Sequence, residues 1–180
     1  MNITLVRHGE IDEKYIGRYN GHIDIELSKK GLQDAKRLGI KLQEKTFDAI
    51  FCSDLKRAKD TLSQFPHAKD NVIYTNRLRE KSWGRHEGMS FDEITSKEGI
   101  KYKNFLQWIN CLDGESIEEF QTRIKEFFFE YLQNTDKKDI LIITHSGVIK
   151  TFLSITKKTP LKEAFSLDIP YCSVTSASLF

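Results

Sequence analysis

The sequence predicts an α/β protein, a three-layer sandwich in which helices cover both faces of a mostly parallel sheet. Short β-type runs occur at residues 3–6, 48–52, 72–75, 139–144 and 174–180, and amphipathic helical patterns separate the first four. Alternation of this kind favours parallel strands joined by right-handed crossovers. A chain of 180 residues fits a single domain, 1–180, that can bury a core without disulfides or a structural metal.

Three of the expected helices have a start signal in the sequence. Ser28 is a candidate N-cap, and Ser90 and Ser116 each precede a glutamate by three residues, the pattern of a capping box. Asp54 is the expected cap of a further helix. In the helix after Ser28 the expected core residues are Leu32, Ala35, Leu38 and Leu42. In the helix after Asp54 they are Leu55, Ala58, Leu62 and Phe65. In the helix after Ser116 they are Phe120, Ile124, Phe127, Tyr131 and Leu132.

One segment departs from the alternation. Residues 77–88 carry no clear pattern and are followed by helices to about residue 110. We expect residues 77–112 to form a small helical insertion over one end of the sheet that shapes a substrate pocket, with a purely structural excursion as the alternative. Arg79, Lys81, Trp83, Arg85, His86, Tyr102 and Trp108 are its candidate pocket residues.

Composition and charge exclude several classes of protein. The 28 basic and 26 acidic side chains give a net charge of +2, too small to indicate nucleic-acid or membrane-surface binding. The three cysteines form no C-x-x-C pair, which argues against a disulfide framework or a zinc knuckle. No export signal and no run of about 20 apolar residues is present. We therefore expect a cytoplasmic protein without nucleic-acid or membrane partners.

Basic residues follow three of the predicted strands. Arg7-His8-Gly9 follows the first, the stretch from Ser53 to Arg57 follows the second, and His145-Ser146-Gly147 follows the fourth. Ligands of open α/β sheets bind beyond the carboxyl ends of the strands, so these side chains are expected to share one crevice. Grouped cations call for an anionic ligand, and phosphate fits the planar fork of arginine and the N-terminus of the helix after Gly147.

Other phosphate chemistries lack their sequence patterns. The chain has no phosphate-binding loop of nucleotide hydrolases, and Cys52 stands one residue too close to Arg57 for a cysteine phosphatase. Ser146 is not part of a G-x-S-x-G turn. His8, Glu80 and His145 could hold a metal in principle, but no further carboxylates stand beside them in the sequence. We expect neither a metal nor a cofactor.

Ordered motifs along nearly the whole chain resemble those of the histidine phosphatase superfamily, which has the phosphoglycerate mutase-like fold. The motifs are LVRHGE at 5–10, GRYNGH at 17–22, LSKKG at 27–31, CSDLKRA at 52–58, LRE at 78–80 with G at 84 and EG at 87–88, GES at 114–116, and THSG at 144–147. The family's T/S-x-x-N after R-H-G-E is replaced here by residues 11–14, which puts Lys14 at the position of an asparagine.

The resemblance implies a role for each motif residue. His8 is the expected nucleophile that forms a phosphohistidine, Arg7, Arg57 and His145 bind the phosphoryl oxygens, and Glu80 is the proton donor. Ser146, Asn20 and Gly21 are further expected substrate contacts. Lys14 either contacts phosphate or points to solvent.

Charge requirements differ among these groups. His8 must be neutral to attack, with a backbone carbonyl accepting the proton of one ring nitrogen, whereas a cationic His145 would help to neutralise the phosphoryl group. Glu80 must be protonated when the leaving group departs, which neighbouring cations oppose; pairing with an arginine is its alternative role.

The expected function is hydrolysis of a small phosphorylated metabolite by a metal-independent phosphomonoesterase. The short insertion and a last strand that ends the chain predict little shielding of a phosphoenzyme, which favours hydrolysis over transfer. The stretches 17–22 and 47–58 are similar to those of phosphatases that act on α-ribazole 5′-phosphate or on sugar phosphates. A cofactor-dependent phosphoglycerate mutase and a noncatalytic module that binds phosphorylated ligands are the alternatives.

Overall fold

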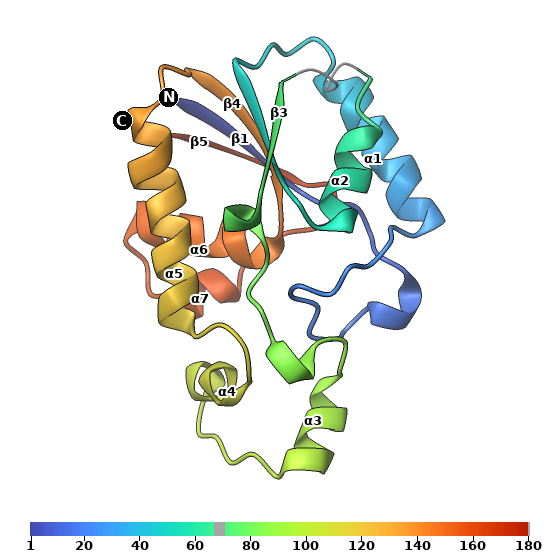
Figure 1. Cartoon of the computed structure of the whole chain (residues 1–180), viewed down its shortest axis with the longest axis vertical. Helices are drawn as coiled ribbons and strands as arrows, with labels where there is room; N and C mark the ends of the chain where they lie inside the picture. The colour runs from blue at the N-terminus through green and yellow to red at the C-terminus, as the bar shows by residue number, and fades with distance from the viewer. Residues whose placement is uncertain (67–70, 180) are drawn as a thin grey trace.

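The computed structural model describes residues 1–66 and 71–179, which contain a five-stranded sheet of order β3-β2-β4-β1-β5 (Figure 1). The strands are β1 (Asn2–Arg7), β2 (Ala49–Ser53), β3 (Val72–Thr75), β4 (Asp139–Thr144) and β5 (Val174–Ser178). The first four are parallel and β5 runs antiparallel to β1. All five predicted strands are confirmed; Phe180, the end of the last predicted run, lies outside the described residues.

Helices cover both faces of this sheet (Figure 1). One layer contains α1 (Lys29–Leu42) and α2 (Lys56–Ser63), and the other contains α5 (Ile117–Lys125), α6 (Ser146–Lys157) and the short α7 (Leu161–Phe165). Successive side chains of β4 alternate between the layers, because Leu141 and Ile143 pack with α1 and α2 while Ile140 and Ile142 pack with α5 and α6. The predicted three-layer sandwich is confirmed.

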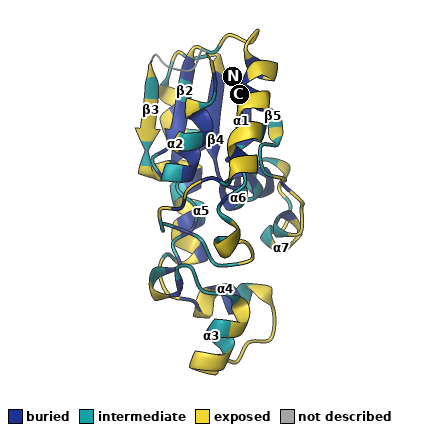
Figure 2. Ribbon diagram, turned by 90° about the vertical axis from the view of Figure 1, so that its right-hand side faces the viewer, coloured by how far each residue is buried: buried dark blue, intermediate teal, exposed yellow. Residues whose placement is uncertain are grey.

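The strands differ in how far they are buried. Five of the six residues of β4 are buried, whereas the edge strand β3 has no buried residue (Figure 2). A strand covered on both faces is apolar at every position. The continuous apolar run at residues 140–143 therefore predicted β4 well. In the described part of the chain, no helix has both the length and the apolar character that a bilayer crossing requires. The cytoplasmic location stays a prediction.

Three of the four expected helix starts are confirmed. Ser28 accepts a hydrogen bond from the Gly31 N–H, and complete capping boxes are present at Ser90 and Ser116. The Asp54 cap is wrong, since α2 begins at Lys56 without a side-chain cap. The Asp54 carboxylate instead accepts two hydrogen bonds of 2.7 Å from the Arg79 guanidinium.

Two of the expected core positions are also wrong. Leu32 is 37% exposed, because α1 turns its neighbour Gly31 toward the Glu10 backbone. The approach is so close that a Cβ at Gly31 would lie 2.1 Å from the Glu10 carbonyl oxygen. Tyr131 is 41% exposed. After α5 ends, a π-helical turn at Glu126–Tyr131 rotates the side chains that follow, and Phe128 takes the buried place.

The segment between β3 and α5 extends beyond the carboxyl edge of the sheet (Figure 1). It contains 3₁₀ turns at Asn76–Leu78 and Gly84–His86 and two helices, α3 (Phe91–Glu98) and α4 (Phe105–Cys111). Trp83, Ile94, Trp108, Ile109, Leu112 and Ile117 form its own small core. Trp108 Nε1 donates a 2.6 Å hydrogen bond to the Tyr19 hydroxyl, so the insertion is joined to the loop before α1.

Candidate active site

The carboxyl ends of β1, β2 and β4 bring two histidines together. Arg7 pairs with Thr144 in the sheet, and the His8 N–H donates to the Thr144 carbonyl at 2.9 Å. His8 and His145 therefore leave adjacent strands at the same level, and their ring centroids are 5.1 Å apart. The sheet topology alone produces this convergence of residues that are far apart in the sequence.

His8 is buried and held by its own backbone. Its Nδ1 lies 2.8 Å from the Gly9 carbonyl oxygen, which can only accept, so Nδ1 carries the proton and Nε2 keeps its lone pair. Burial, Arg57 and Arg7 together hold the pKa of His8 well below its usual value. The ring is thus a neutral imidazole with one fixed tautomer, as the sequence led us to expect.

Gly9 is required for packing against α1. A Cβ at this position would lie 2.8 Å from the Gly31 carbonyl oxygen at the start of that helix. The Gly9 N–H also donates to Thr61 Oγ1 at 2.8 Å, which ties the His8 loop to α2. The glycine therefore fixes where the nucleophile candidate sits relative to the α1–α2 layer.

Two arginines stand beside His8 and carry no carboxylate partner among the described residues. Arg57 is almost fully buried and donates to the carbonyls of Ile23 and Gly21 at 3.0 and 2.7 Å, and burial lowers its pKa to about 10. Arg7 donates to the Ile169 carbonyl at 2.5 Å, while its Nε is buried without a hydrogen-bond partner. Both guanidinium groups retain their charge for an anion in the crevice.

His145 has no exposed surface. Its Nε2 lies 2.8 Å from Ser53 Oγ, and its Nδ1 is buried without a partner. Burial, followed by the charges of Arg57 and His8, lowers the pKa of His145 well below its usual value. Desolvation and neighbouring cations thus favour the neutral ring while no anion is in the crevice, and a cationic His145 beside a bound phosphoryl group stays a prediction.

Glu80 reaches the same crevice from the insertion and rests on the N-terminus of α6. Its Oε2 accepts a 2.9 Å hydrogen bond from the Gly147 N–H, and its Oε1 accepts one of 3.0 Å from the Lys81 N–H. The helix N-terminus expected to bind phosphate thus donates to Glu80 instead. Pairing with an arginine is not observed, since within residues 1–66 and 71–179 no guanidinium lies within 4.0 Å of this carboxylate.

The crevice is a cavity of about 270 Å³. Arg7, His8, Arg57 and Glu80 line it, as do Asn20 and Ser146 from the predicted set. Gly21 contributes the carbonyl that receives Arg57, and His145 lies beside His8, but neither of them is among the lining residues. Lys14 also lies outside it, because its exposed ammonium is directed to Asp12 at 3.8 Å.

Of the candidate pocket residues in the insertion, only Lys81 and Trp83 line the cavity. Arg79 pairs with Asp54, while Arg85 and His86 both contact Glu98. Tyr102 and Trp108 contact each other within the insertion. Nine lining residues were not predicted as site residues. Gly17, Arg18, Tyr19 and Gly147 stand within the motifs, and Ile11 stands where the family has a threonine or serine. No strand-end position or motif marks the remaining four: Tyr15, Lys150, Phe165 and Tyr171.

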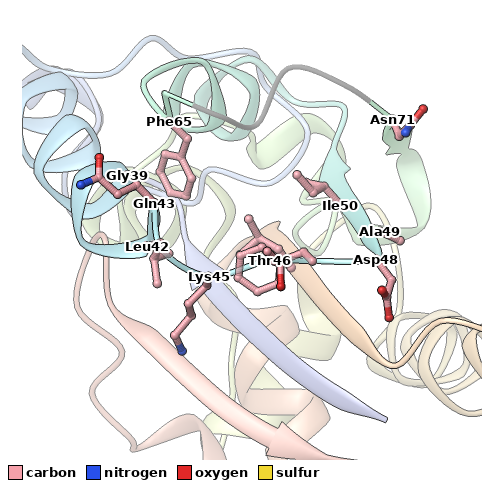
Figure 3. Close-up of a pocket in the computed structure, with 12 residues that line it drawn as sticks. Gly39, Leu42, Gln43, Lys45, Thr46, Asp48, Ala49, Ile50, Phe65 and Asn71 are labelled. Carbon is pink, nitrogen blue, oxygen red and sulfur yellow. The ribbon is translucent and has the colours of Figure 1, made fainter.

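A second cavity, of about 320 Å³, lies near the amino end of β2 (Figure 3). Apolar and backbone groups of α1 and β2 form much of its wall, and Lys45 and Asp48 are the charged residues among those that line it. None of the histidines or arginines described above borders it. We therefore place the candidate active site in the smaller cavity.

Within the described residues, no three histidine, cysteine, aspartate or glutamate side chains are grouped so that they could bind a metal ion. His8, Glu80 and His145 in particular do not form such a group.

Comparisons with known proteins identify the family. The family model described as the histidine phosphatase superfamily (branch 1) matches residues 3–179. An adenosylcobalamin/alpha-ribazole phosphatase of Salmonella typhimurium is 29% identical over 158 residues, covering 86% of this chain and 78% of that protein. A metal-independent phosphoserine phosphatase of Arabidopsis thaliana is 31% identical over 163 residues, covering 86% and 68%. The solved structure of Bacillus stearothermophilus YhfR superposes with a TM-score of 0.87 at 32% identity, covering 99% of this chain and 91% of that one.

Proposed function

Because the chain belongs to the histidine phosphatase superfamily (branch 1), we propose that it hydrolyses a small phosphomonoester through a phosphohistidine at His8. One observation carries the proposal most directly. His8 is a buried neutral imidazole whose Nδ1 is anchored to the Gly9 carbonyl. It lines a cavity together with two arginines that have no carboxylate partner in the part of the chain that the structure describes. Attack on a phosphate dianion needs a nucleophile with a lone pair, here Nε2 of His8, and unpaired positive charges beside it, here the two guanidinium groups.

In the first step, His8 Nε2 forms a bond to phosphorus while the ester P–O bond breaks. Arg7 and Arg57 oppose the charge on the equatorial oxygens, and the leaving oxygen takes its proton from Glu80. In the second step, the Glu80 carboxylate accepts a proton from water, whose oxygen attacks phosphorus as the N–P bond breaks. Inorganic phosphate and a neutral His8 are regenerated, so one turnover consumes one water molecule.

His145 completes the phosphate site in this proposal. Its Nδ1 is buried and lacks a partner, and the ring lies beside His8. A phosphate dianion would favour the protonated ring and therefore oppose the effect of burial and of the arginines on the pKa of His145. His145 would thus be neutral until the substrate is bound and would gain charge with it.

The substrate class is a small phosphomonoester. The cavity of about 270 Å³ suits a compact ester, and apolar rings such as Tyr15 and Trp83 share its lining with the cations. The relatives described above are named for an α-ribazole ester and for phosphoserine. α-Ribazole 5′-phosphate, phosphoserine and sugar phosphates are therefore the esters to compare.

The test is hydrolysis of such a panel in the presence of EDTA by wild type, His8→Ala and the control Lys14→Ala. We expect turnover without metal, a loss of several orders of magnitude in His8→Ala, and no change in Lys14→Ala, whose side chain lies outside the cavity. Mass spectrometry of quenched wild type should find the phosphoryl group on residue 8.

Three results would contradict the proposal. Turnover that EDTA abolishes would indicate a metal enzyme, and exchange that depends on 2,3-bisphosphoglycerate would indicate the mutase alternative. Saturable binding of phosphorylated ligands with no release of phosphate from any ester would indicate the noncatalytic module.

A further inference from the structure

Residues 169–173, which lead into β5, are fastened to the start of the active-site loop. The Arg7 N–H donates to the Ser173 carbonyl at 3.2 Å, and the Cys172 N–H lies 3.2 Å from the carbonyl oxygens of both Arg7 and His8. Cys172 adopts a left-handed conformation with φ of 55°, which is unfavourable for a residue other than glycine. The backbone directly after Tyr171 is therefore held against the Arg7–His8 dipeptide.

This attachment places the Tyr171 ring against both site residues. The guanidinium carbon of Arg7 lies 3.8 Å from the centre of the ring, a stacking distance, and the His8 ring centroid lies 5.6 Å away. Tyr171 also lines the active-site cavity. One face of the ring thus covers the guanidinium beside the nucleophile candidate.

Arg7 is oriented by a ring and a carbonyl instead of a carboxylate. In the described part of the chain, no carboxylate lies within 4.0 Å of its guanidinium, and Ile169 supplies the one carbonyl that its side chain reaches. An ion pair would fix the side chain but would also neutralise it. An aromatic face holds the planar group in place and leaves its charge available to a phosphoryl oxygen.

We propose that Tyr171 is a positioning residue, which holds the Arg7 guanidinium by stacking so that its free N–H groups face the phosphoryl group of the substrate. This inference rests on the proposed function for its role in turnover. Its direct consequence, tighter binding of a phosphate anion, can be measured without turnover.

The test compares binding of inorganic phosphate, by calorimetry, among wild type, Tyr171→Phe and Tyr171→Leu, with Tyr74→Leu as control. Tyr74 is an exposed tyrosine on β3 and is not among the residues that line the cavity. We expect Tyr171→Leu, which keeps bulk but loses the aromatic face, to weaken phosphate binding roughly tenfold. Tyr171→Phe should restore most of the affinity, and Tyr74→Leu should bind as wild type does.

A double-mutant cycle separates positioning from general packing. If Tyr171 acts through Arg7, then Tyr171→Leu should change phosphate affinity little in an Arg7→Ala background. An equal loss in both backgrounds, or unchanged affinity in the single Tyr171→Leu variant, would overturn the inference. Normal phosphate binding with this coupling but no ester hydrolysis would instead uphold the role of Tyr171 and contradict the proposed function.

Discussion

In the proposed reaction one carboxylate acts first as an acid and then as a base. Among the described residues that line the cavity, Glu80 is the single carboxylate. Its two oxygens accept backbone N–H groups of Lys81 and Gly147, so the side chain is fixed without an arginine partner. This arrangement lets the group exchange a proton with the leaving oxygen without first breaking an ion pair.

The Glu80→Gln variant tests that role. Glutamine keeps the size of the side chain but cannot transfer a proton, so kcat/KM for alkyl phosphates should fall by about 10²- to 10³-fold. For 4-nitrophenyl phosphate, whose leaving group needs no proton, kcat/KM should fall less than about tenfold. The measurement is the ratio of the two losses, and equal losses would remove Glu80 from the acid role.

Single residues show where the sequence was informative. Motif residues that directly follow strands, such as His8 after β1 and His145 after β4, could be placed together because topology brings neighbouring strand ends side by side. The partner of Asp54 and the role of Tyr171 could not be found, since each depends on a side-chain contact between segments distant in sequence. The lowered pKa of His145 in the anion-free site could not be predicted either, because burial is its largest cause and no sequence pattern reports burial.

The N-terminus of α6 joins the sheet edge to the insertion. Gly147, in its first turn, donates to Glu80, and a Cβ at this position would lie 2.1 Å from Glu80 Oε1. The atoms that would be displaced are the far end of a flexible side chain. The helix can therefore tolerate a larger residue there, but the carboxylate cannot keep its place.

Gly147→Ala should consequently impair activity more than stability. Alanine favours the helix by up to about 1 kcal/mol, which offsets part of the steric cost, whereas the displaced Glu80 should lower kcat/KM for alkyl phosphates by at least about tenfold. Thermal unfolding and kinetics together provide the check. The control is Lys157→Ala, an exposed change in the last turn of the same helix, and a Gly147→Ala enzyme with full activity would contradict the prediction.

Elements were predicted from the sequence as far as local patterns determine them. Buried strands and serine caps follow from periodicity and from hydrogen bonds within one turn, and they appear where expected. The π-helical turn after α5 was not predicted, because regular helical periodicity had been assumed through residue 132. Packing of Phe127 and Phe128 against the sheet, a tertiary effect, accompanies the wider turn.

Across the whole molecule, folding concentrates titratable groups at one edge of the sheet. His8 and His145 are buried beside Arg7 and Arg57, and the pKa of each histidine lies well below its usual value for that reason. In the unfolded chain the same histidines are exposed to water and protonate with a pKa of about 6.5. Building a phosphate site therefore makes the fold itself sensitive to pH.

The sign of that dependence follows from proton binding. Below about pH 6.5 the histidines of the unfolded state take up protons. The folded histidines do not, because their pKa is lowered. The free energy of unfolding should therefore decrease as the pH falls. Each histidine contributes up to about 1.4 kcal/mol per pH unit until its folded pKa is reached. The lowered carboxylate pKa values, such as that of Glu98 at about 2, matter only at more acidic pH.

Urea unfolding between pH 7 and 5 measures this slope. Wild type should lose stability steadily over the interval, and the double variant His8→Asn/His145→Asn should show a clearly flatter dependence because both groups that resist protonation are gone. His22, whose pKa is also lowered by burial, accounts for part of the remaining slope. Equal slopes in wild type and the double variant would mean that the two histidines take up protons in the folded state as readily as in the unfolded chain. That result would contradict the lowered pKa values and the neutrality of His8 at the acidic end of this interval.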